Sequence, residues 1–335
     1  NRIDTRIPTN NPNDQPIKKT MDYTALKNAP RLLIEAKLKP LQGDRFQPTG
    51  FADLGAARYK TADGTDMLLV ESAQSVANRL EMAIWDEATE DLISELKGLP
   101  YIRVNNPDGS MLTNSILEAH RINSEYILKF NTKPTEFHRR IQEEIGYEKD
   151  KPVNNRRLVK TVLKYDPNSV LHGSFLEEIG GRLRIMRAIS GFVEASNVST
   201  AESGGVKNNH VQPELKGGEG NVPFPRTEFT AEKITAYFNL DLALLRGYGL
   251  SEEATNFLIS LALFKVRRFF NEGLRLRTAC DLDVIDSIIV TRPNGFTIPS
   301  DVELLSEAKS LLQKCIDNGL FAKPSTTVVQ IEGAK

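Results

Sequence analysis

The sequence predicts an α+β fold, and three observations lead to this class. Strand and helix patterns interleave along the chain. No Gly-rich phosphate loop follows a strand, because G-x-G-x-x-G, Walker A and G-x-S-x-G motifs are all missing from the sequence. A long stretch rich in Gly, Asn, Ser and Pro, residues 198–228, separates two strand patterns. We therefore expect a small sheet covered by helices, with a long excursion between two of its strands.

The first third of the chain contains clear local signals. Residues 31–40 alternate between apolar and charged side chains, which predicts a half-buried strand with a basic open face. Asp63-Gly64 lies between two short strand patterns and indicates a hairpin. Ser72 is typical of a helix N-cap, and the helix is expected to continue to about Trp85. A further short strand is predicted at 101–104.

The rest of the chain is predicted in the same way from periodicity. The stretch 198–228 has no periodicity, so it is either functional or disordered. The other expected elements are helical structure over 136–164, strands at 183–197 and 233–241, a helix at 251–271, a strand at 284–291 and a helix at 301–318.

Length and composition indicate a globular protein. The chain has 335 residues, of which 40% are hydrophobic and 26% charged. No apolar run approaches the roughly 20 residues that a membrane span needs, and no signal peptide is expected, because residues 1–20 contain no apolar segment. Residues 1–20 are rich in Asn, Pro and charge and are expected to be a disordered leader or an expression remnant. We expect residues 21–335 to form one domain.

The two cysteines, Cys280 and Cys315, do not form a disulfide framework. They fit a reducing cytoplasm. Neither has another Cys or a His at zinc-ligand spacing, so no structural metal and no cofactor are expected.

Basic residues are unevenly distributed, although the formal net charge is only -1. Three clusters are apparent: 182–187, 265–277, and the group of Lys37, Lys39 and Arg45. Arginine predominates in the first two, which favours bidentate phosphate contact or stacking on bases. The alternative is that each cluster is an ordinary solvated face with surface ion pairs.

Two Gly-containing segments are further binding candidates. Residues 42–51 combine Arg45, Phe46 and Gln47 with two glycines, which allow a backbone to approach a ligand closely. Phe175 and Leu176 follow Gly173 directly before the first arginine cluster. An ordinary turn and ordinary core residues are the alternatives for these two segments.

Signals for catalysis are weak. Asp281, Asp283 and Asp286 could bind Mg²⁺, but a connection between a helix and a strand with solvated acids is the preferred explanation. The four histidines are scattered, and His120 next to Arg121 is the one that could serve a ribonuclease. We expect no catalytic residue and no metal site.

Four long segments resemble one known family. They are RLLIEAKLKPLQGDRFQPTGFADLGAA, MLLVESAQSVANRLE, NVPFPRTEFTAEKITAYFNLDL and KVRRFFNEGLRLRTACDLD. The chain, from about residue 21 to about residue 290, resembles the RAMP-superfamily backbone subunit, the Cas seven family, of type I-G (formerly I-U) CRISPR interference complexes.

Backbone subunits of other type I systems show a looser similarity. Their Ser-x-Gln-Ser segment, which opens a helix on the guide-RNA backbone, looks like residues 72–75, followed by Asn78 and Arg79. Their base-wedging residue looks like Phe175 or Leu176, and their thumb looks like 198–228. The sequence departs from the relatives at Ala77, where a basic residue is common, so this contact is less secure.

The resemblance implies a hand-shaped protein with a modified RRM or ferredoxin-like palm sheet, helical insertions and a long thumb-like arm. It implies a guide-RNA (crRNA) subunit that stacks head-to-tail with further copies and presents bases to target DNA, beside other effector subunits and without a membrane. The alternatives are a RAMP-type ribonuclease acting on crRNA or target RNA and a generic α+β protein. The residues expected to contact RNA are Lys37, Lys39, Arg45, Gln47, Ser72, Gln74, Asn78, Arg79, Arg182, Arg184, Arg187, Arg268, Arg275 and Arg277.

Overall fold

The fold is built on one large antiparallel sheet, as a computed structural model shows. The structure describes residues 21–51, 53–181, 183–208 and 221–331. Seven strands follow the order β16-β17-β1-β15-β14-β5-β4, and each neighbouring pair is antiparallel. Their bounds are β1 Arg31–Pro40, β4 Arg58–Lys60, β5 Asp66–Glu71, β14 Ile189–Asn208, β15 Asn221–Asp241, β16 Arg275–Arg277 and β17 Cys280–Arg292. The α+β class is confirmed.

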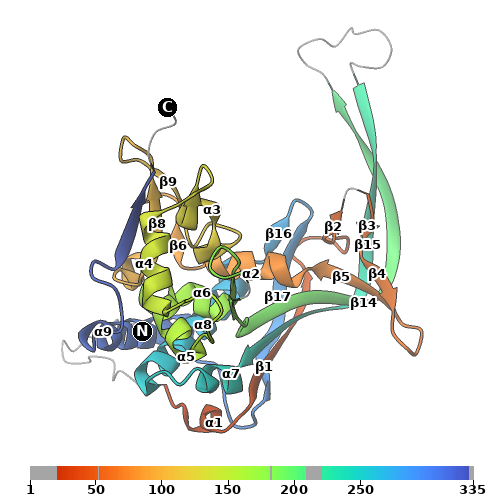
Figure 1. Ribbon diagram of the computed structural model, residues 1–335. Coiled ribbons are helices and arrows are strands. Elements are labelled where there is room, and N and C mark those ends of the chain that lie inside the picture. Colours follow the sequence, from red (N-terminus) through yellow and green to blue (C-terminus); the bar gives the residue numbers. More distant parts are fainter. Residues whose placement is uncertain (1–20, 52, 182, 209–220, 332–335) are drawn as a thin grey trace, which may run out of the picture.

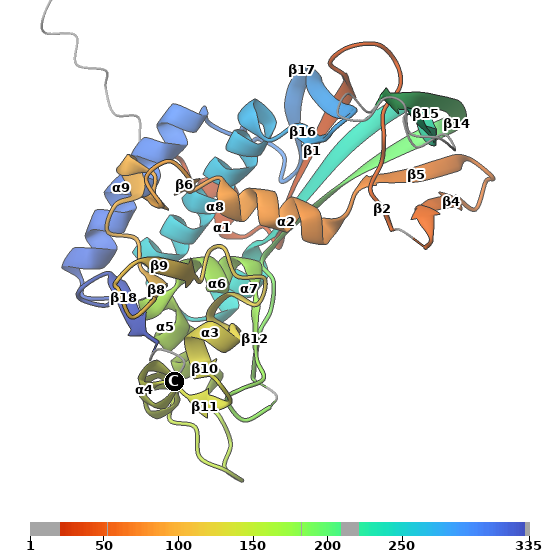
Figure 2. The ribbon, with the colours of Figure 1, turned by 90° about the horizontal axis from the view of Figure 1, so that it is seen from above.

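Helices gather on one side of the molecule, while β4, β5, β14 and β15 extend on the other (Figures 1 and 2). The longest helix, α8, packs its Phe269 against Phe238 of β15, with ring centroids 5.3 Å apart. The helices are α1 Thr24–Lys27, α2 Ala73–Met82, α3 Glu125–Leu128, α4 Glu136–Ile145, α5 Asn155–Tyr165, α6 Pro167–His172, α7 Leu242–Gly247, α8 Glu252–Glu272 and α9 Asp301–Asp317, with 3-10 turns η1 Ser94–Leu96 and η2 Arg121–Asn123.

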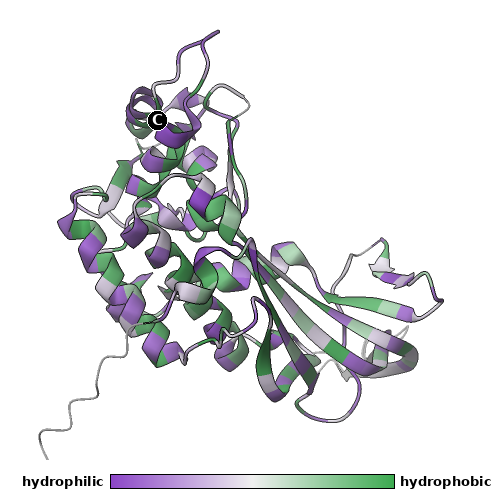
Figure 3. Cartoon of the chain, turned by 90° about the horizontal axis from the view of Figure 1, so that it is seen from below, coloured by the Kyte–Doolittle hydropathy of each residue, from purple (hydrophilic) through white to green (hydrophobic). Residues whose placement is uncertain are grey.

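The alternation of β1 decides which face of the sheet is core. Leu32, Ile34, Ala36 and Leu38 are buried, because side chains two apart in a strand share a face. The charged positions between them point to the other face. Seen from below, the strands show the same alternation of apolar and polar bands (Figure 3). The predicted strand at 31–40 is confirmed.

The segment 198–228 differs from its prediction. Instead of an aperiodic arm, β14 and β15 form a hairpin paired from Ile189 with Leu240 to Asn208 with Asn221. Figure 1 shows these two strands projecting from the body of the molecule. Backbone pairing with the neighbouring strand, rather than a buried apolar face, holds this part of the hairpin, and for that reason hydrophobic periodicity did not reveal it. Residues 209–220 lie outside the described residues.

Smaller sheets complete the fold. The predicted strand at 101–104 is β8, and it lies between a parallel β18 and an antiparallel β9. The remaining strands are β2 Gly50–Phe51, β3 Gly55–Ala56, β6 Trp85–Asp86, β7 Asp91–Leu92, β8 Tyr101–Asn105, β9 Met111–Asn114, β10 Lys129–Phe130, β11 Lys133–Pro134, β12 Ser174–Leu176, β13 Leu183–Ile185 and β18 Thr326–Gln330.

Several other predictions can be compared with the structure. The hairpin at Asp63-Gly64 is confirmed as β4–β5, and Ser72 caps α2 by accepting from the backbone N–H of Ser75. The helix ends at Met82 rather than near Trp85, which lies in β6. Asp281, Asp283 and Asp286 lie within β17 and not in a helix-to-strand connection.

Two predictions on the limits of the chain stay open. Residues 1–20 lie outside the described residues, and the single domain over 21–335 stays a prediction. Among the described residues, no helix is long and apolar enough to cross a membrane.

Candidate nucleic-acid interface

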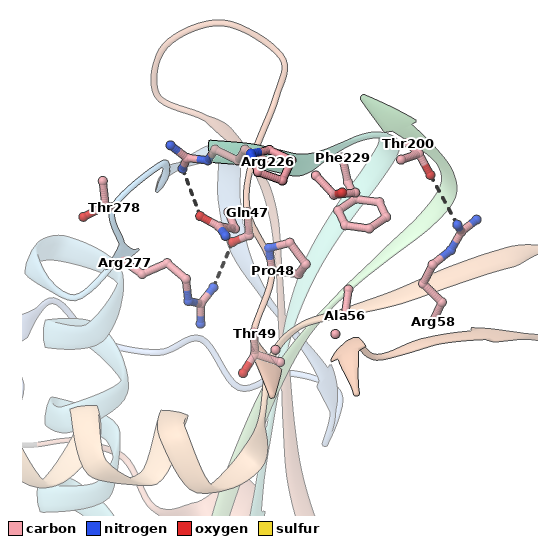
Figure 4. A pocket seen from close by; sticks show the side chains of 14 residues that line it. Gln47, Pro48, Thr49, Ala56, Arg58, Thr200, Arg226, Phe229, Arg277 and Thr278 are labelled. Atoms are coloured by element: carbon pink, nitrogen blue, oxygen red, sulfur yellow. Dashed lines mark hydrogen bonds between the residues drawn. The ribbon is translucent and has the colours of Figure 1, made fainter. Parts of the chain in front are cut away.

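A pocket of about 870 Å³ lies at the base of the β14–β15 hairpin. It is bounded by the loop after β1, the β3 and β4 segments, both hairpin strands and the turn between β16 and β17 (Figure 4). Its described lining contains three arginines, Arg58, Arg226 and Arg277, and no carboxylate. Such a lining suits a phosphate-bearing ligand, because guanidinium groups match phosphate geometry.

Arg277 is the most firmly held of these arginines. Its Nη1 donates to the carbonyl oxygens of Gln47 and Val70, at 3.0 and 3.1 Å, and its Nη2 donates to the carboxylate of Glu71. Glu71 is fully buried at the end of β5. Arg277 of β16 is therefore hydrogen-bonded both to the loop after β1 and to β5. Only part of its guanidinium group remains for contact with a ligand.

A second buried carboxylate, Glu228 of β15, holds the other wall of the pocket. It accepts hydrogen bonds from Arg45 and from Ser203, both at 3.1 Å, and lies 3.4 Å from Nε of Arg226. Arg226 in turn donates to Oε1 of Gln47 at 2.9 Å (Figure 4). The two predicted residues Arg45 and Gln47 thus meet at the base of the hairpin.

The backbone reinforces this junction. Phe46 and Phe229 exchange two hydrogen bonds of 2.9 Å and so tie the loop after β1 to β15. Arg58 of β4 closes the opposite side, because it donates to Thr200 at 3.2 Å and lies 5.8 Å above the ring of Phe229. The orientation of the hairpin root is consequently fixed from both sides.

Sequence reasoning missed Arg58, Arg226 and the two buried carboxylates Glu71 and Glu228. Arg226 and Glu228 fall in the stretch that was treated as aperiodic. Arg58 stands in a short strand beside Tyr59 and Lys60, where its alternation carried no signal. Treating 198–208 and 221–231 as two paired strands would have indicated the hairpin and its residues Arg226 and Glu228. It would not have indicated Arg45 and Arg58, which contact the hairpin from other segments.

The N-terminal half of α2 brings three of the predicted residues together. Gln74 donates to Asn78 at 3.0 Å and accepts from Nη2 of Arg187 at 3.0 Å. Arg187 also donates to the carbonyl of His172 at 3.3 Å. The predicted RNA contacts from two distant sequence segments therefore adjoin, while the hydroxyl of Ser72 is used as the helix cap.

The expected base-wedging segment forms the small hairpin of β12 and β13. Phe175 is 37% exposed, with the guanidinium of Arg184 4.5 Å above its ring, whereas Leu176 is fully buried. Leu176 is thus a core residue, and of the two alternatives only Phe175 can reach a base. Arg182 lies outside the described residues.

Gly173, directly before β12, packs closely against the backbone that leaves β13. Its φ of +81° belongs to the left-handed region, and a Cβ there would lie 2.9 Å from the backbone nitrogen of Arg187. Its carbonyl accepts from Nη1 of Arg121 at 3.3 Å. Glycine therefore permits the close approach of residue 173 to the backbone of Ile185 and Arg187, at the end of β13.

The cluster at 265–277 is less open than its sequence indicated. Lys265 is fully buried, and Arg267 donates to the carbonyls of Ile298 and Pro299. Arg275 is exposed on β16, and Arg268 pairs with Glu272 at 3.0 Å. Long-range packing of α8, which sequence spacing does not show, decides which of these cations face solvent.

Arg79 and Arg268 line a second pocket, between α2 and α8, together with Asn78. Arg79 donates to the carbonyls of Arg275 and Leu276, so it links α2 to the backbone of β16. Lys37 and Lys39 are exposed on the other face of the sheet from the buried residues of β1. The structure therefore does not bring these two lysines to the pockets.

A buried polar network lies beneath α2. The carboxylate of Glu81 receives two hydrogen bonds from Arg121, at 2.6 and 2.9 Å, and one from Asn168 at 2.8 Å. Lys265 donates to Asn168 and lies 3.1 Å from Nε2 of His172. Burial lowers the pKa of Lys265 to about 7, and burial together with the Lys265 charge lowers the pKa of His172.

The residues that were considered for catalysis, His120 and the aspartates of β17, do not form a common site in the structure. His120 is exposed, and its neighbour Arg121 is committed to Glu81. Asp283 uses one carboxylate oxygen for the backbone of Val284. Among the described residues no group of His, Cys, Asp or Glu could hold a metal ion. Whether the protein is an enzyme stays untested.

The family model of CRISPR-associated protein GSU0053 matches residues 32–200, half of the chain. The chain therefore belongs to this CRISPR-associated family. A search of curated proteins gives no match.

Two solved structures show distant similarity. One is a chain of a CRISPR RNA-guided surveillance complex, pre-nicking, with a TM-score of 0.42 and 13% identity over 76% of this chain and 74% of that chain. The other is Csc2 of Thermofilum pendens, with a TM-score of 0.30 and 10% identity over 90% of this chain and 81% of that chain.

Proposed function

We propose that this protein is a crRNA-binding backbone subunit of a type I-G CRISPR interference complex, acting in the cytoplasm without chemistry of its own. One observation carries the proposal. In a chain of a CRISPR-associated family, a projecting hairpin has an arginine-lined pocket at its base. This arrangement offers phosphate contacts on the body and an arm that extends away from them.

The charges support binding to a phosphate backbone rather than to bases. The pocket combines guanidinium groups with the hydroxyls of Thr49, Thr200 and Thr278, and such groups recognise phosphate and sugar without reading sequence. Sequence would then be read by pairing between guide and target, to which this subunit contributes backbone and shape recognition.

The hairpin fits the role of a thumb. Because the contacts of Glu228 and Phe229 fix its root, a neighbouring copy that meets it would be held at a constant distance. Head-to-tail stacking of identical copies would generate an open filament along the RNA. In this arrangement the sheet is an RRM-like palm, and the exposed Phe175 wedges beside a displaced base.

Co-purification tests the proposal. The tagged chain is expressed with a CRISPR array and its neighbouring genes, the particle is sized, and the bound RNA is sequenced. We expect a large particle containing spacer-length guide RNA and several copies of this chain. A monomer without RNA would refute the proposal.

The ribonuclease alternative is tested with the same preparation. Cleavage of labelled crRNA or target RNA by the purified chain, lost on Asp283→Ala, would show an activity that the proposal denies. We expect no cleavage by either protein.

A further inference from the structure

The helix α5 carries four basic residues and no acidic one. Arg156, Lys160 and Lys164 follow one another at intervals of four residues, so they lie on one side of the helix. A shallow hollow of about 350 Å³ runs along this side and is lined by Asn154, Arg156, Arg157, Lys160, Thr161 and Lys164. The pocket at the hairpin base uses none of these residues.

This charge pattern is unfavourable for the helix itself. Like charges four residues apart on a helix repel one another. The positive end of the helix dipole lies at the N-terminus, where acidic residues are stabilising. The first turn of α5 nevertheless contains Arg156 and Arg157 and no acidic residue. Such departures from the rules of local stability are expected where a surface has a function.

Two of the four cations fasten α5 to α4. Arg157 donates to the carbonyl oxygens of Glu143 and Glu144, at 3.0 and 2.6 Å. The ammonium group of Lys164 donates to both carboxylate oxygens of Glu144, at 2.9 and 2.8 Å. These bonds fix the position of the helix, and they leave the contact with a ligand to the other two cations.

Arg156 and Lys160 are the cations that remain available. Lys160 is exposed, and it forms no hydrogen bond or ion pair with any residue that the structure describes. Arg156 is also exposed and uses Nε for the carbonyl oxygen of Gly249 at 3.1 Å, so both of its terminal nitrogens can contact a ligand. The face therefore presents two uncompensated positive charges on a rigid helix.

The lining of the hollow favours a duplex phosphate backbone over a protein or an unpaired strand. It contains no large apolar side chain, whereas the centre of a protein interface is typically apolar. It also contains no aromatic ring on which an unpaired base could stack. Arg and Lys contact the phosphates of duplex DNA without reading its bases. From residue 156 to residue 164 a helix rises about 12 Å, a length over which duplex DNA presents about seven phosphate charges.

The face is also separate from the proposed guide-RNA site. α5 lies among the helices, on the other side of the molecule from the β14–β15 hairpin (Figures 1 and 2). A duplex on α5 would therefore leave the pocket at the hairpin base free.

We infer that the exposed face of α5 binds the phosphate backbone of double-stranded DNA without reading its sequence, through Arg156 and Lys160. This goes beyond the proposed function, in which DNA meets the complex by pairing with the guide. Here the protein itself holds the duplex, and it does so without guide RNA.

The test measures binding of the full chain to a short, fluorescently labelled DNA duplex of mixed sequence, by anisotropy over a series of salt concentrations. The log of the affinity falls with the log of the salt concentration by about 0.9 for each phosphate contact in duplex DNA. The same titration is made with single-stranded uridine homopolymer RNA and with polyglutamate, which represents an acidic protein surface.

The test variant is Arg156→Gln with Lys160→Gln. Its matched control is Lys309→Gln with Lys314→Gln on α9, two exposed lysines that form no salt bridge within the described part of the chain. We expect the salt slope for the duplex to decrease by about 1.8 in the test variant, for two lost contacts, and to stay unchanged in the control. Lys160→Glu is a second variant that breaks no bond of the fold, and it should also lower the affinity for the duplex.

Each outcome decides the inference. A slope that decreases in the test variant alone supports it. Equal slopes in the test variant and the control overturn it, and so does an effect of the test variant on the uridine polymer or on polyglutamate in place of the duplex. Guide-RNA retention in the co-purified complex tests the proposed function separately. A complex that retains guide RNA, with a purified chain that does not bind the duplex, overturns the inference and leaves the proposed function standing.

Discussion

The buried network beneath α2 and the base of the β14–β15 hairpin contain the same chemistry in different surroundings. Both pair glutamates with basic side chains. In the network, Glu81, Arg121 and Lys265 are all buried, so each donor is used within the protein. At the hairpin base, buried carboxylates hold arginines that stay partly exposed, such as Arg45 and Arg277. Exposure of the cation, rather than the ion pair itself, distinguishes the structural network from the proposed binding site.

The largest effect is expected in the network. Glu81→Ala leaves the charge of Arg121 buried without its carboxylate and removes the acceptor of Asn168, which should lower the free energy of unfolding by about 3–5 kcal/mol. Urea denaturation followed by circular dichroism measures this. A loss below about 1 kcal/mol would mean that the network is wetter than the structure shows.

Asp166 caps α6 next to this network by accepting hydrogen bonds from Ser169, and it should give the protein a characteristic pH dependence. Burial raises the pKa of Asp166 to about 6, so the folded state holds its proton longer than the unfolded state does. Its contribution to stability is present below about pH 4 and is lost as pH rises from about 4 to 6. Relative to Asp166→Asn, the wild type should lose stability in this window and nowhere else. Parallel stability curves would contradict the assignment.

Arg277→Ala should affect both stability and RNA binding. It removes hydrogen bonds to Gln47, Val70 and the buried Glu71, which we expect to cost about 1–3 kcal/mol of unfolding free energy. Thermal unfolding and RNA retention are measured on the same variant. Unchanged stability would show that Arg277 is a surface residue.

Arg58→Ala and Arg275→Ala should change binding with little effect on the fold. Both side chains are exposed and pair with no carboxylate among the residues that the structure describes, so the unfolding free energy should stay within about 0.5 kcal/mol. Each loss should reduce the slope of log affinity against log salt by about 0.7 for a single strand. Salt slopes equal to that of the wild type would show that these two arginines do not contact RNA phosphates.

The sequence by itself determined the local features. The alternation of 31–40, the Ser72 cap, the hairpin at Asp63-Gly64 and helices α8 and α9 were predictable, because each depends on residues close together in the chain. The arginine clusters and the family resemblance were also visible in the sequence, and the family match agrees with the CRISPR-associated class.

Only the tertiary structure decided which of these residues can meet a ligand. It buried Lys265 and Leu176, committed much of Arg277 to internal bonds and added Arg58 and Arg226 to the pocket. It also paired the two halves of the stretch 198–228. The physical reason is that exposure and pairing depend on segments distant in the sequence: the carboxylate that holds Arg277 comes from β5, 206 residues away.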